Sequence, residues 1–434
     1  MPAQTPASPG TIADAVSEQQ LHATVEKLVS FGTRHTLSSQ TDPKRGIGAA
    51  TRWAEEEFER YAKACGGCLA IAKPSDTVTG RRVPTPTKVT DVLAIQKGTS
   101  DPNRVIIISG HIDSRVTDVM DFTSDAPGAN DDGSGTAAVI EAARVLSKHK
   151  FPATIVYAVL VGEEQGLLGG KILADYAKAQ GWQVEAVLNN DIIGNSLGAD
   201  GLSDDAHVRV LSEGVRGDWT PELIAAQRSL GGFNDAPSRN LSRFVAGLAE
   251  DLALGLDVRQ IWRTDRFGRG GDHIPFQQAG YPAIRFSVAV ENYDWQHQDL
   301  RTENGIQYGD TIDKMDFAYL ARVTKLNVAA LAALARAPMP PEPEVKGAVS
   351  TDTTLSWASV PAADGYVVRW RRTDAAHWEH ALRLPGNATG HVLKGVRVDD
   401  WVFGVSSVSA DGFEGPVASA VPGGAFKPWM PPAK

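Results

Sequence analysis

Apolar residues recur at helical spacing through the first part of the chain. Five of them follow one another at intervals of three to five positions: Ile12, Val16, Leu21, Val25 and Leu28. A second amphipathic pattern is marked by three aromatic residues, Trp53, Phe58 and Tyr61. Because this spacing places side chains on one face of a helix, the chain from about residue 11 to about residue 64 is predicted to be helical.

From residue 92 onward, short apolar runs alternate with helical patterns. The runs that we predict to be strands cover 92–96, 105–109, 154–161, 184–189 and 283–288. The segments with helical spacing cover 136–148, 168–179 and 316–335. Strands that are buried on both faces are largely apolar, as the runs 105–109 and 154–161 are. The alternation therefore predicts an α/β fold with a mixed, largely parallel central sheet flanked by helices.

Residues 195–270 interrupt this alternation. They are loop-rich, with helices predicted over 221–230 and 238–252. We interpret them as an insertion that lies over the site and shapes access to it, inside a first domain of residues 11–337.

The character of the chain changes after a proline-rich run, Ala337-Pro-Met-Pro-Pro-Glu-Pro-Glu344. Such a run is a stiff linker. Beyond it, over residues 338–425, short alternating strands predict an all-β sandwich. This segment resembles a fibronectin type III domain, with Trp357 in the position of that family's early core tryptophan, followed by the pair Gly365-Tyr366. We expect this domain to contact either a surface or the first domain.

The composition excludes some classes of partner. The 434 residues are 42% hydrophobic, with a formal net charge of -9 and a pI of about 5.6. An acidic chain is not suited to nucleic acid or to an anionic membrane. No uninterrupted apolar stretch reaches the ~18 residues of a membrane span.

Two features bear on localisation. The only cysteines, Cys65 and Cys68, are spaced C-x-x-C. Without further ligands nearby they predict either a local disulfide or two free thiols rather than a zinc ribbon. The start of the chain is rich in Pro, Ala, Ser and Thr and has no basic or apolar signal region. The protein is then either cytosolic or has lost a signal peptide, and we favour the second, a secreted or periplasmic bacterial protein.

Five short segments carry carboxylates and histidines at or near predicted strand ends. They are His111-Ile-Asp113, Gly128-Ala-Asn-Asp-Asp-Gly-Ser-Gly135, Gly162-Glu-Glu164, Asn190-Asp191 and His297-Gln-Asp299. Each alone has an ordinary explanation, such as a polar loop, an acidic turn or an Asp that caps a helix. Sites form at the carboxyl ends of parallel strands, so five such segments together predict a water molecule activated between two divalent metal ions.

The residue types suggest different roles. Asp113 can orient the imidazole of His111. A carboxylate has two oxygens, so one Asp of the Gly-rich loop can bridge two cations. Glu163 and Glu164 point in opposite directions on an extended chain, so one can bind metal while the other acts as general base. The last ligand is either His273 or His297.

The ordered set resembles the bacterial leucine aminopeptidase-like di-zinc exopeptidases of metallopeptidase family twenty-eight, over roughly residues 20–335. Asn130-Asp-Asp-Gly-Ser-Gly and Gly162-Glu-Glu are its most specific parts. The resemblance implies that Glu163 is the general base and that Asp272 and His273 line the site. It implies two ions, one held by His111, Asp131 and Asp191 and the other by Asp131, Glu164 and His297. Nitrogen and oxygen ligands suit zinc, for which cobalt or manganese can substitute.

The chain departs from this family in the last loop. His297 is followed by Gln298-Asp299-Leu300, and an Asp-Thr pair occurs only at Asp310-Thr311. The tyrosine that helps to hold the oxyanion in the family has no obvious counterpart, and the candidates are Tyr293, Arg266 and Arg269. Glu291 is the candidate for recognition of a substrate α-amine, or else an ordinary solvated residue after a strand.

These observations predict a metal-dependent exopeptidase that hydrolyses N-terminal residues from peptides. The alternatives are a glutaminyl cyclase-like enzyme with a single zinc ion and a non-catalytic binding or adhesion protein on the same fold.

Overall fold

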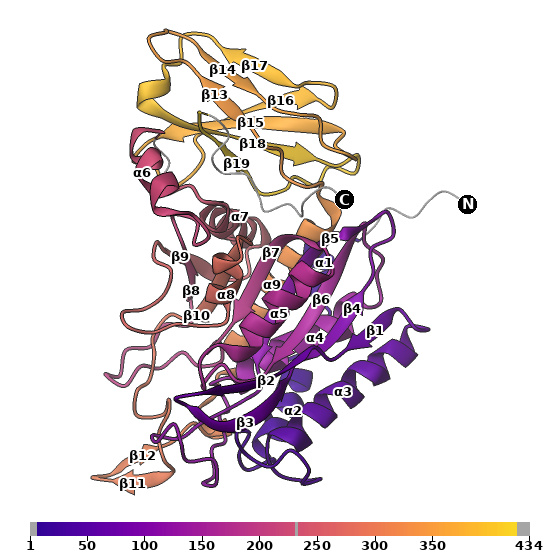
Figure 1. The fold of residues 1–434 in the computed structure, drawn as a ribbon, viewed down its shortest axis with the longest axis vertical. Coiled ribbons are helices and arrows are strands. Elements are labelled where there is room, and N and C mark those ends of the chain that lie inside the picture. The colour runs from indigo at the N-terminus through magenta and orange to yellow at the C-terminus, as the bar shows by residue number, and fades with distance from the viewer. Residues whose placement is uncertain (1–6, 231–232, 423–434) are drawn as a thin grey trace.

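The computed structural model describes residues 7–230 and 233–422, which form a large α/β domain with a smaller β domain at one end (Figure 1). The large domain is built on an eight-stranded sheet of order β1-β4-β6-β5-β7-β10-β8-β9. Its strands are β1 (Leu69–Ala72), β4 (Val92–Gln96), β5 (Asp101–His111), β6 (Ala153–Leu160), β7 (Gln183–Asn190), β8 (His207–Ser212), β9 (Asp257–Ile261) and β10 (Ala283–Val288). The neighbours β6, β5, β7 and β10 run parallel, whereas β4 and β8 pair antiparallel to this central group. The predicted mixed, largely parallel sheet is confirmed.

Strand β5 shows why the central strands are continuously apolar. Ile106 and Ile108 point into the core on one face, while Val105 and Ile107 point into the core on the other. The first face is covered by α1 (Pro9–Ala13), α2 (Glu18–Val29), α3 (Ile47–Ala64), α4 (Gly133–Leu146) and α9 (Phe317–Arg336). The second is covered by α5 (Leu168–Ala179) and α8 (His273–Gln278). Both faces are therefore dry, and burial of these side chains is the main source of the domain's stability.

Helix α9 is, among the described helices, the one long and apolar enough to cross a membrane. Most of its residues are buried inside the domain, where it packs on α1, α4 and β5. A helix that is apolar nearly all round and enclosed by its own domain is what a core helix looks like.

The segment 195–270 differs from the loop-rich insertion that we predict. It holds helices α6 (Pro221–Leu230) and α7 (Pro237–Leu252), as expected, but it also adds strands β8 and β9 to the edge of the main sheet. These strands are short and carry polar residues at alternate positions, as in His207-Val-Arg-Val. The end of the same segment reaches the candidate site described below.

Two smaller features connect the main elements. Cys65, at the end of α3, and Cys68, just before β1, form a disulfide with an S–S distance of 2.08 Å. Two hairpins leave the main sheet, β2 (Ser75–Gly80) with β3 (Val83–Thr90) and β11 (Arg301–Glu303) with β12 (Ile306–Tyr308). A short 3-10 helix, Ile312–Lys314, leads into α9.

The C-terminal residues form two antiparallel sheets. One contains β13 (Glu344–Lys346), β14 (Thr353–Ser356) and β17 (Gly390–Leu393); the other contains β16 (His380–Pro385), β15 (Gly365–Arg372), β18 (Trp401–Val408) and β19 (Ala418–Ala420). A 3-10 helix, Val398–Asp400, precedes β18. Trp357 packs on Tyr366 in the core between the sheets, with ring centroids 5.4 Å apart. The predicted all-β sandwich is confirmed, while its likeness to fibronectin type III domains stays a prediction.

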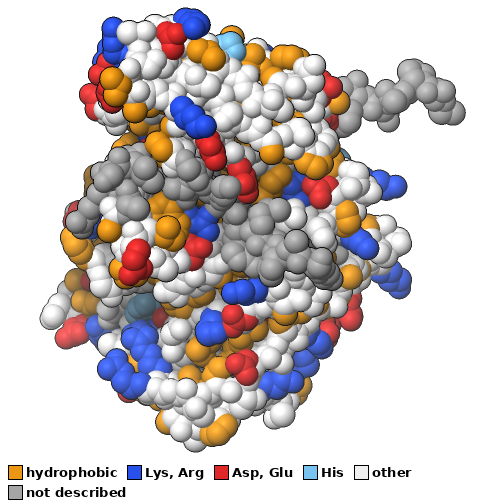
Figure 2. Space-filling model, turned by 45° about the horizontal axis from the view of Figure 1, so that its top comes forward, with side chains coloured by type: hydrophobic (Ala, Val, Ile, Leu, Met, Phe, Trp, Pro, Cys, Tyr) orange, Lys and Arg blue, Asp and Glu red, His pale blue; other side chains and the backbone are white. Residues whose placement is uncertain are grey.

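Charged side chains of both signs are interspersed over the described part of the face that Figure 2 shows. One charged group, by contrast, is buried where the two domains meet. Asp235, before α7, accepts a 2.9 Å bond from Arg243 on that helix and a bond from Arg371 on β15. Asn240 on α7 donates to Ser419 on β19 at 2.7 Å. Polar contacts therefore join the sandwich to α7.

We expect Arg371→Met to destabilise the chain by about 1–3 kcal/mol, because it removes one partner of a buried ion pair while Arg243 continues to offset the Asp235 charge. Urea unfolding of the full chain measures this change. Arg383→Met, at an exposed position of β16, is the matched control and is expected to change the free energy of unfolding by less than about 0.5 kcal/mol. Equal effects of the two substitutions would contradict the role of the ion pair.

Candidate active site

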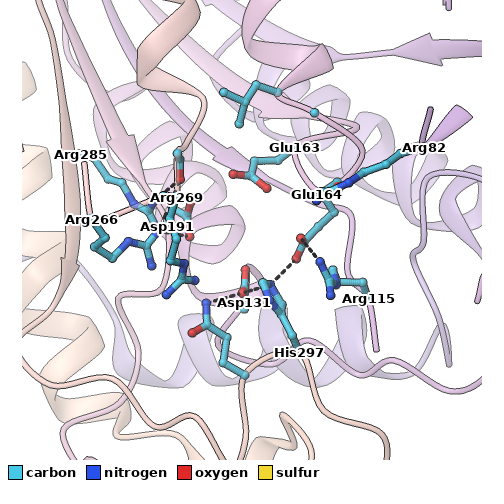
Figure 3. A pocket seen from close by; sticks show the side chains of 15 residues that line it. Arg82, Arg115, Asp131, Glu163, Glu164, Asp191, Arg266, Arg269, Arg285 and His297 are labelled. Carbon is cyan, nitrogen blue, oxygen red and sulfur yellow. Dashed lines mark hydrogen bonds and ion pairs between the residues drawn. The ribbon is translucent and has the colours of Figure 1, made fainter. Parts of the chain in front are cut away.

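The predicted polar segments converge at the carboxyl-terminal ends of the central strands, where Figure 3 shows Asp131, Glu163, Glu164, Asp191 and His297 around one cavity. Strand β5 ends at His111, which lies in register with Leu160 at the end of β6, and Ser109 of β5 lies beside Asn189 near the end of β7. Glu163 and Glu164 therefore follow β6, and Asp191 follows β7, at the carboxyl-terminal ends of these parallel strands. Asp131 comes from the loop before α4, and His297 comes from a loop after β10. The sheet register thus brings together His111, the two glutamates and Asp191, and two loops add Asp131 and His297.

Asp131 lies between two histidines. Its Oδ1 is 3.3 Å from Nε2 of His111, and its Oδ2 is 2.9 Å from Nε2 of His297. Nε2 of His297 is also 2.9 Å from Oε1 of Glu164, and Nε2 of His111 is 3.9 Å from Oδ1 of Asp191. Each oxygen of one carboxylate thus faces a different imidazole, which is the arrangement that a bridging metal ligand requires.

The electrostatics of this cluster favour cations. Burial acts to lower the pKa of His297, but Glu164 and Asp131 outweigh it and raise this pKa to about 10. Burial acts to raise the pKa of Asp131, but His297 and His111 outweigh it and hold this pKa well below its usual value. The carboxylates thus hold positive charge on an imidazole, in a place where a metal ion would serve the same purpose.

Glu163 lies in the cavity with its carboxylate directed toward the other acids (Figure 3). Loss of hydration and the nearby charges of Asp191 and Glu164 raise its pKa well above the usual value, against the effect of His111. Ligand atoms of His111, Glu163 and Asp191 lie within 4.8 Å of one another, and so do those of Asp131, Glu164 and His297. By distance alone, Glu163 is thus placed either to bind an ion or to act as a base beside it.

Asp113 supports the turn that carries the two glutamates. Its carboxylate accepts N–H bonds from Gly162, Glu163 and Glu164 at 2.8, 3.3 and 3.2 Å, and a hydroxyl bond from Thr36 at 2.9 Å. The sequence suggests that Asp113 orients His111 through this carboxylate. In the structure Nδ1 of His111 is 3.0 Å from the backbone oxygen of Asp113 and 3.6 Å from its Oδ1. The backbone oxygen is therefore the nearer partner of the imidazole.

Asp310 supports the loop that carries Asp131, a role that the sequence does not reveal. Its carboxylate accepts the backbone N–H of Asn130 at 2.9 and 3.0 Å and that of Asp131 at 2.7 Å. Burial raises the pKa of Asp310 to about 7, although these N–H groups act to lower it. The buried Arg34 donates to the carbonyls of Pro127 and Gly128 in the same loop. The one signal in the sequence is the displaced Asp310-Thr311 pair.

We expect Asp310→Asn to lower the free energy of unfolding by about 1–3 kcal/mol, because even with the amide oxygen at the Oδ2 position its NH2 group would face the N–H of Asn130. We also expect weaker retention of metal, since those bonds position Asp131. Urea unfolding and titration with zinc measure the two effects. Asp313→Asn is the control, because its side chain is 64% exposed; an equal effect there would argue against the positioning role.

The structure distinguishes the two candidate histidines. His297 belongs to the cluster, with 28% of its side chain exposed to the cavity. His273 is buried on α8, where its Nε2 is 2.8 Å from the backbone oxygen of Thr264, and burial lowers its pKa to about 4. Asp272 accepts the N–H of Gly170 at 3.1 Å. Neither Asp272 nor His273 is among the described residues that line the cavity.

Glu291 is enclosed by arginines rather than open to a substrate amine. Its Oε1 binds Arg209, and its Oε2 is 3.1 Å from Arg266 and 2.7 Å from Arg269. These cations lower the pKa of Glu291 to about 2, although burial acts to raise it. Tyr293 is 61% exposed and does not line the cavity. A cationic amine would have to displace these guanidinium groups, so the geometry does not favour Glu291 for amine recognition.

The cavity beside the cluster has a volume of ≈ 440 Å³ and a lining rich in both signs of charge. Its acidic groups are Asp131, Glu163, Glu164 and Asp191. Its basic groups are five arginines, Arg82, Arg115, Arg266, Arg269 and Arg285. Arg285, which is fully buried, contacts Oδ1 of Asp191 at 2.8 Å. Of these five arginines, only Arg266 and Arg269 are candidates from the sequence.

Comparison with known proteins decides the family. Residues 91–326 match the model of peptidase family M28. The chain belongs to peptidase family M28. It is 44% identical over 415 residues to a probable zinc metalloprotease of Leptosphaeria maculans, covering 94% of this chain and 96% of that protein. A probable zinc metalloprotease of Pyrenophora teres is 43% identical over 422 residues, covering 94% of this chain and 86% of that protein. This M28 protein is therefore a metallopeptidase.

Solved structures agree in fold. The aminopeptidase LapA of Legionella pneumophila superposes with a TM-score of 0.55 at 20% identity, covering 75% of this chain and 74% of that one. An aminopeptidase from Aneurinibacillus sp. strain AM-1 gives a TM-score of 0.51 at 16% identity, covering 76% and 96%. The M28 chain thus has the fold of zinc exopeptidases.

Proposed function

We propose that this M28 peptidase is an exopeptidase that removes residues from the N-terminus of peptides and that it works with two zinc ions. The observation that carries the proposal is the placement of Asp131, whose two oxygens face His111 and His297 separately. Two ions can share this carboxylate only if each also has ligands of its own. Asp191 on one side and Glu164 on the other meet that need.

The donor set fits zinc. Imidazole nitrogens and carboxylate oxygens are ligands that zinc accepts, and cobalt or manganese would be substitutes. The names of the fungal relatives, probable zinc metalloproteases, support the same metal. His111, Asp131 and Asp191 would hold one ion, and Asp131, Glu164 and His297 the other.

Bound zinc would supply Lewis-acid activation of the scissile carbonyl and of a water molecule. Glu163 takes the proton from the attacking water and gives it to the nitrogen of the leaving amine. Asp113 holds the turn that presents Glu163 through the backbone N–H bonds described above.

Peptides with free and acetylated N-termini test the proposal. We expect the zinc-loaded protein to shorten a free peptide by one residue at a time, followed by mass spectrometry, and to leave its acetylated copy intact. A chelator should abolish the reaction, and zinc should restore it. Internal cleavage of the acetylated peptide would indicate an endopeptidase. Conversion of an N-terminal glutamine without uptake of water would indicate a cyclase.

We also propose that the protein is exported. The disulfide between Cys65 and Cys68 supports this location, because such bonds persist mainly in oxidising compartments. Thiol labelling of the protein from its native source tests the proposal. Full labelling of both cysteines without reductant would contradict it.

A further inference from the structure

Two arginines at the mouth of the cavity are held in place by a buried acid. Arg266 and Arg269 both contact Oε2 of Glu291, whose other oxygen binds Arg209. Arg266 is anchored further by Asp265, at 2.9 Å, and by the backbone oxygen of Gly270, at 3.3 Å. Both side chains lie on the Asp191 side of the cavity (Figure 3). Their guanidinium groups are therefore preorganised before any ligand arrives.

Arg269 has donors to spare. Its side chain is 31% exposed, compared with 12% for Arg266. Within the described part of the chain, the only hydrogen bond of this side chain is the one from Nη1 to Glu291. Nε and the second terminal nitrogen thus remain available. A guanidinium with two free N–H groups side by side binds a carboxylate more tightly than an ammonium group does, because two parallel hydrogen bonds form.

The charge of the cavity favours an anion once the metal site is filled. The four acids that line it would be offset by two divalent cations. Of the remaining acids, Asp265 supplies one negative charge to Arg285 and Arg266, and Glu291 supplies one to Arg266, Arg269 and Arg209 together. Arg82 and Arg115 add two more cations on the Glu164 side (Figure 3). A filled site of this kind attracts a negatively charged ligand.

The geometry points to a carboxylate subsite at Arg269, supported by Arg266, so that the preferred substrates carry a carboxylate close to the scissile bond. This inference rests on the proposed peptidase function and names its substrate class. The carboxylate has two possible sources, the C-terminal α-carboxylate of a dipeptide and the side chain of Asp or Glu in a longer peptide. In either case Arg269 donates two N–H bonds and fixes the peptide beside Glu163.

Matched substrates test the subsite and distinguish the sources. One pair is a dipeptide with a free C-terminus and its C-terminal amide. The other pairs are amidated pentapeptides that differ only by Glu or Gln at the first or second residue. We expect kcat/KM of the zinc-loaded protein to be about tenfold or more higher for the charged member of at least one pair. The pair that shows this preference identifies the source.

Three variants assign the preference to Arg269. Arg269→Gln should bring the charged-to-neutral ratio close to one, mainly through KM, and Arg269→Lys should restore part of it. Arg263→Gln removes the same charge from the same loop, outside the cavity, where Arg263 is exposed and stacks on Phe267. This control should keep the full ratio. Equal or faster turnover of every neutral member by the unmodified protein would overturn the subsite while leaving the peptidase function intact.

If no peptide is hydrolysed, the proposed function fails and the subsite is judged by binding. Calorimetry then compares glutarate with glutaramide on the zinc-loaded protein. Binding of glutarate alone, lost in Arg269→Gln and kept in Arg263→Gln, would support the subsite. Equal binding of the two compounds, or glutarate binding that Arg269→Gln leaves unchanged, would overturn it.

Discussion

Replacement of Glu163 by Gln is expected to lower kcat by about 10²–10⁴-fold while the protein keeps its metal. The amide cannot accept the proton of the attacking water, yet it has nearly the same size and keeps the turn held by Asp113. KM should change little, because the proton transfer belongs to the chemical step. Steady-state kinetics with elemental analysis of the same preparation measures both quantities.

The metal content decides between the two roles that geometry allows for Glu163. Its carboxylate lies within 4.8 Å of ligand atoms of both His111 and Asp191, so by distance it can bind a metal ion. If Glu163 were such a ligand, the substitution would also abolish activity. Glu164→Gln is the matched comparison, since Glu164 contacts His297 at 2.9 Å. We expect Glu164→Gln to lose metal and Glu163→Gln to retain it. Loss of an ion from the Glu163 variant would show that Glu163 is a ligand.

The strands that position the site were predictable because both of their faces are buried. The run 154–161 is apolar after Thr154, and β6 is buried along its whole length, so the strand and its end before Glu163 could be predicted from either face. Strands β8 and β9 were not predicted, because they extend the sheet toward its edge, where alternate residues meet solvent. A short alternating run such as His207–Ser212 has little to distinguish it from a loop.

Some residues of the site were likewise predictable from the sequence, and others were not. His111 ends a strand, Glu164 and Asp191 follow strands and Asp131 precedes a helix, so the local sequence pattern was enough to predict them. Asp310 acts through backbone N–H groups about 180 positions earlier in the chain, a relation that spacing along the sequence does not encode.

Glu291 was a candidate from the sequence, but for a role that the structure does not favour. A carboxylate after a strand is chemically suited to an amine, and nothing in the spacing along the chain points to three arginines as its partners. The three arginines that surround it come from β8 and from the loop before α8. These arginines come together only in the folded chain. There the carboxylate of Glu291 holds their side chains in place instead of facing a substrate amine. The substrate preference that we propose follows from this difference.

Substitutions at Asp131 and His297 should separate a shared metal ligand from an unshared one. Asp131→Ala is expected to leave at most one weakly held ion, because each proposed site loses a carboxylate oxygen. Oδ1 of Asp131 lies 3.3 Å from Nε2 of His111, and Oδ2 lies 2.9 Å from Nε2 of His297. His297→Ala should retain one ion at His111 and Asp191, because neither of these residues is in contact with His297. Elemental analysis after dialysis against a weak chelator gives the two stoichiometries.

Thermal unfolding with and without zinc supplies a second measure. A ligand at about 1,000 times its dissociation constant stabilises the folded state by about 4 kcal/mol per site. The unmodified protein should therefore gain the most on adding zinc, His297→Ala about half as much, and Asp131→Ala the least. His273→Ala removes a histidine that lies outside the cluster, so it should lower stability without changing the gain. If Asp131→Ala and His297→Ala lose the same single ion, Asp131 does not bridge, and a site for one ion replaces the pair.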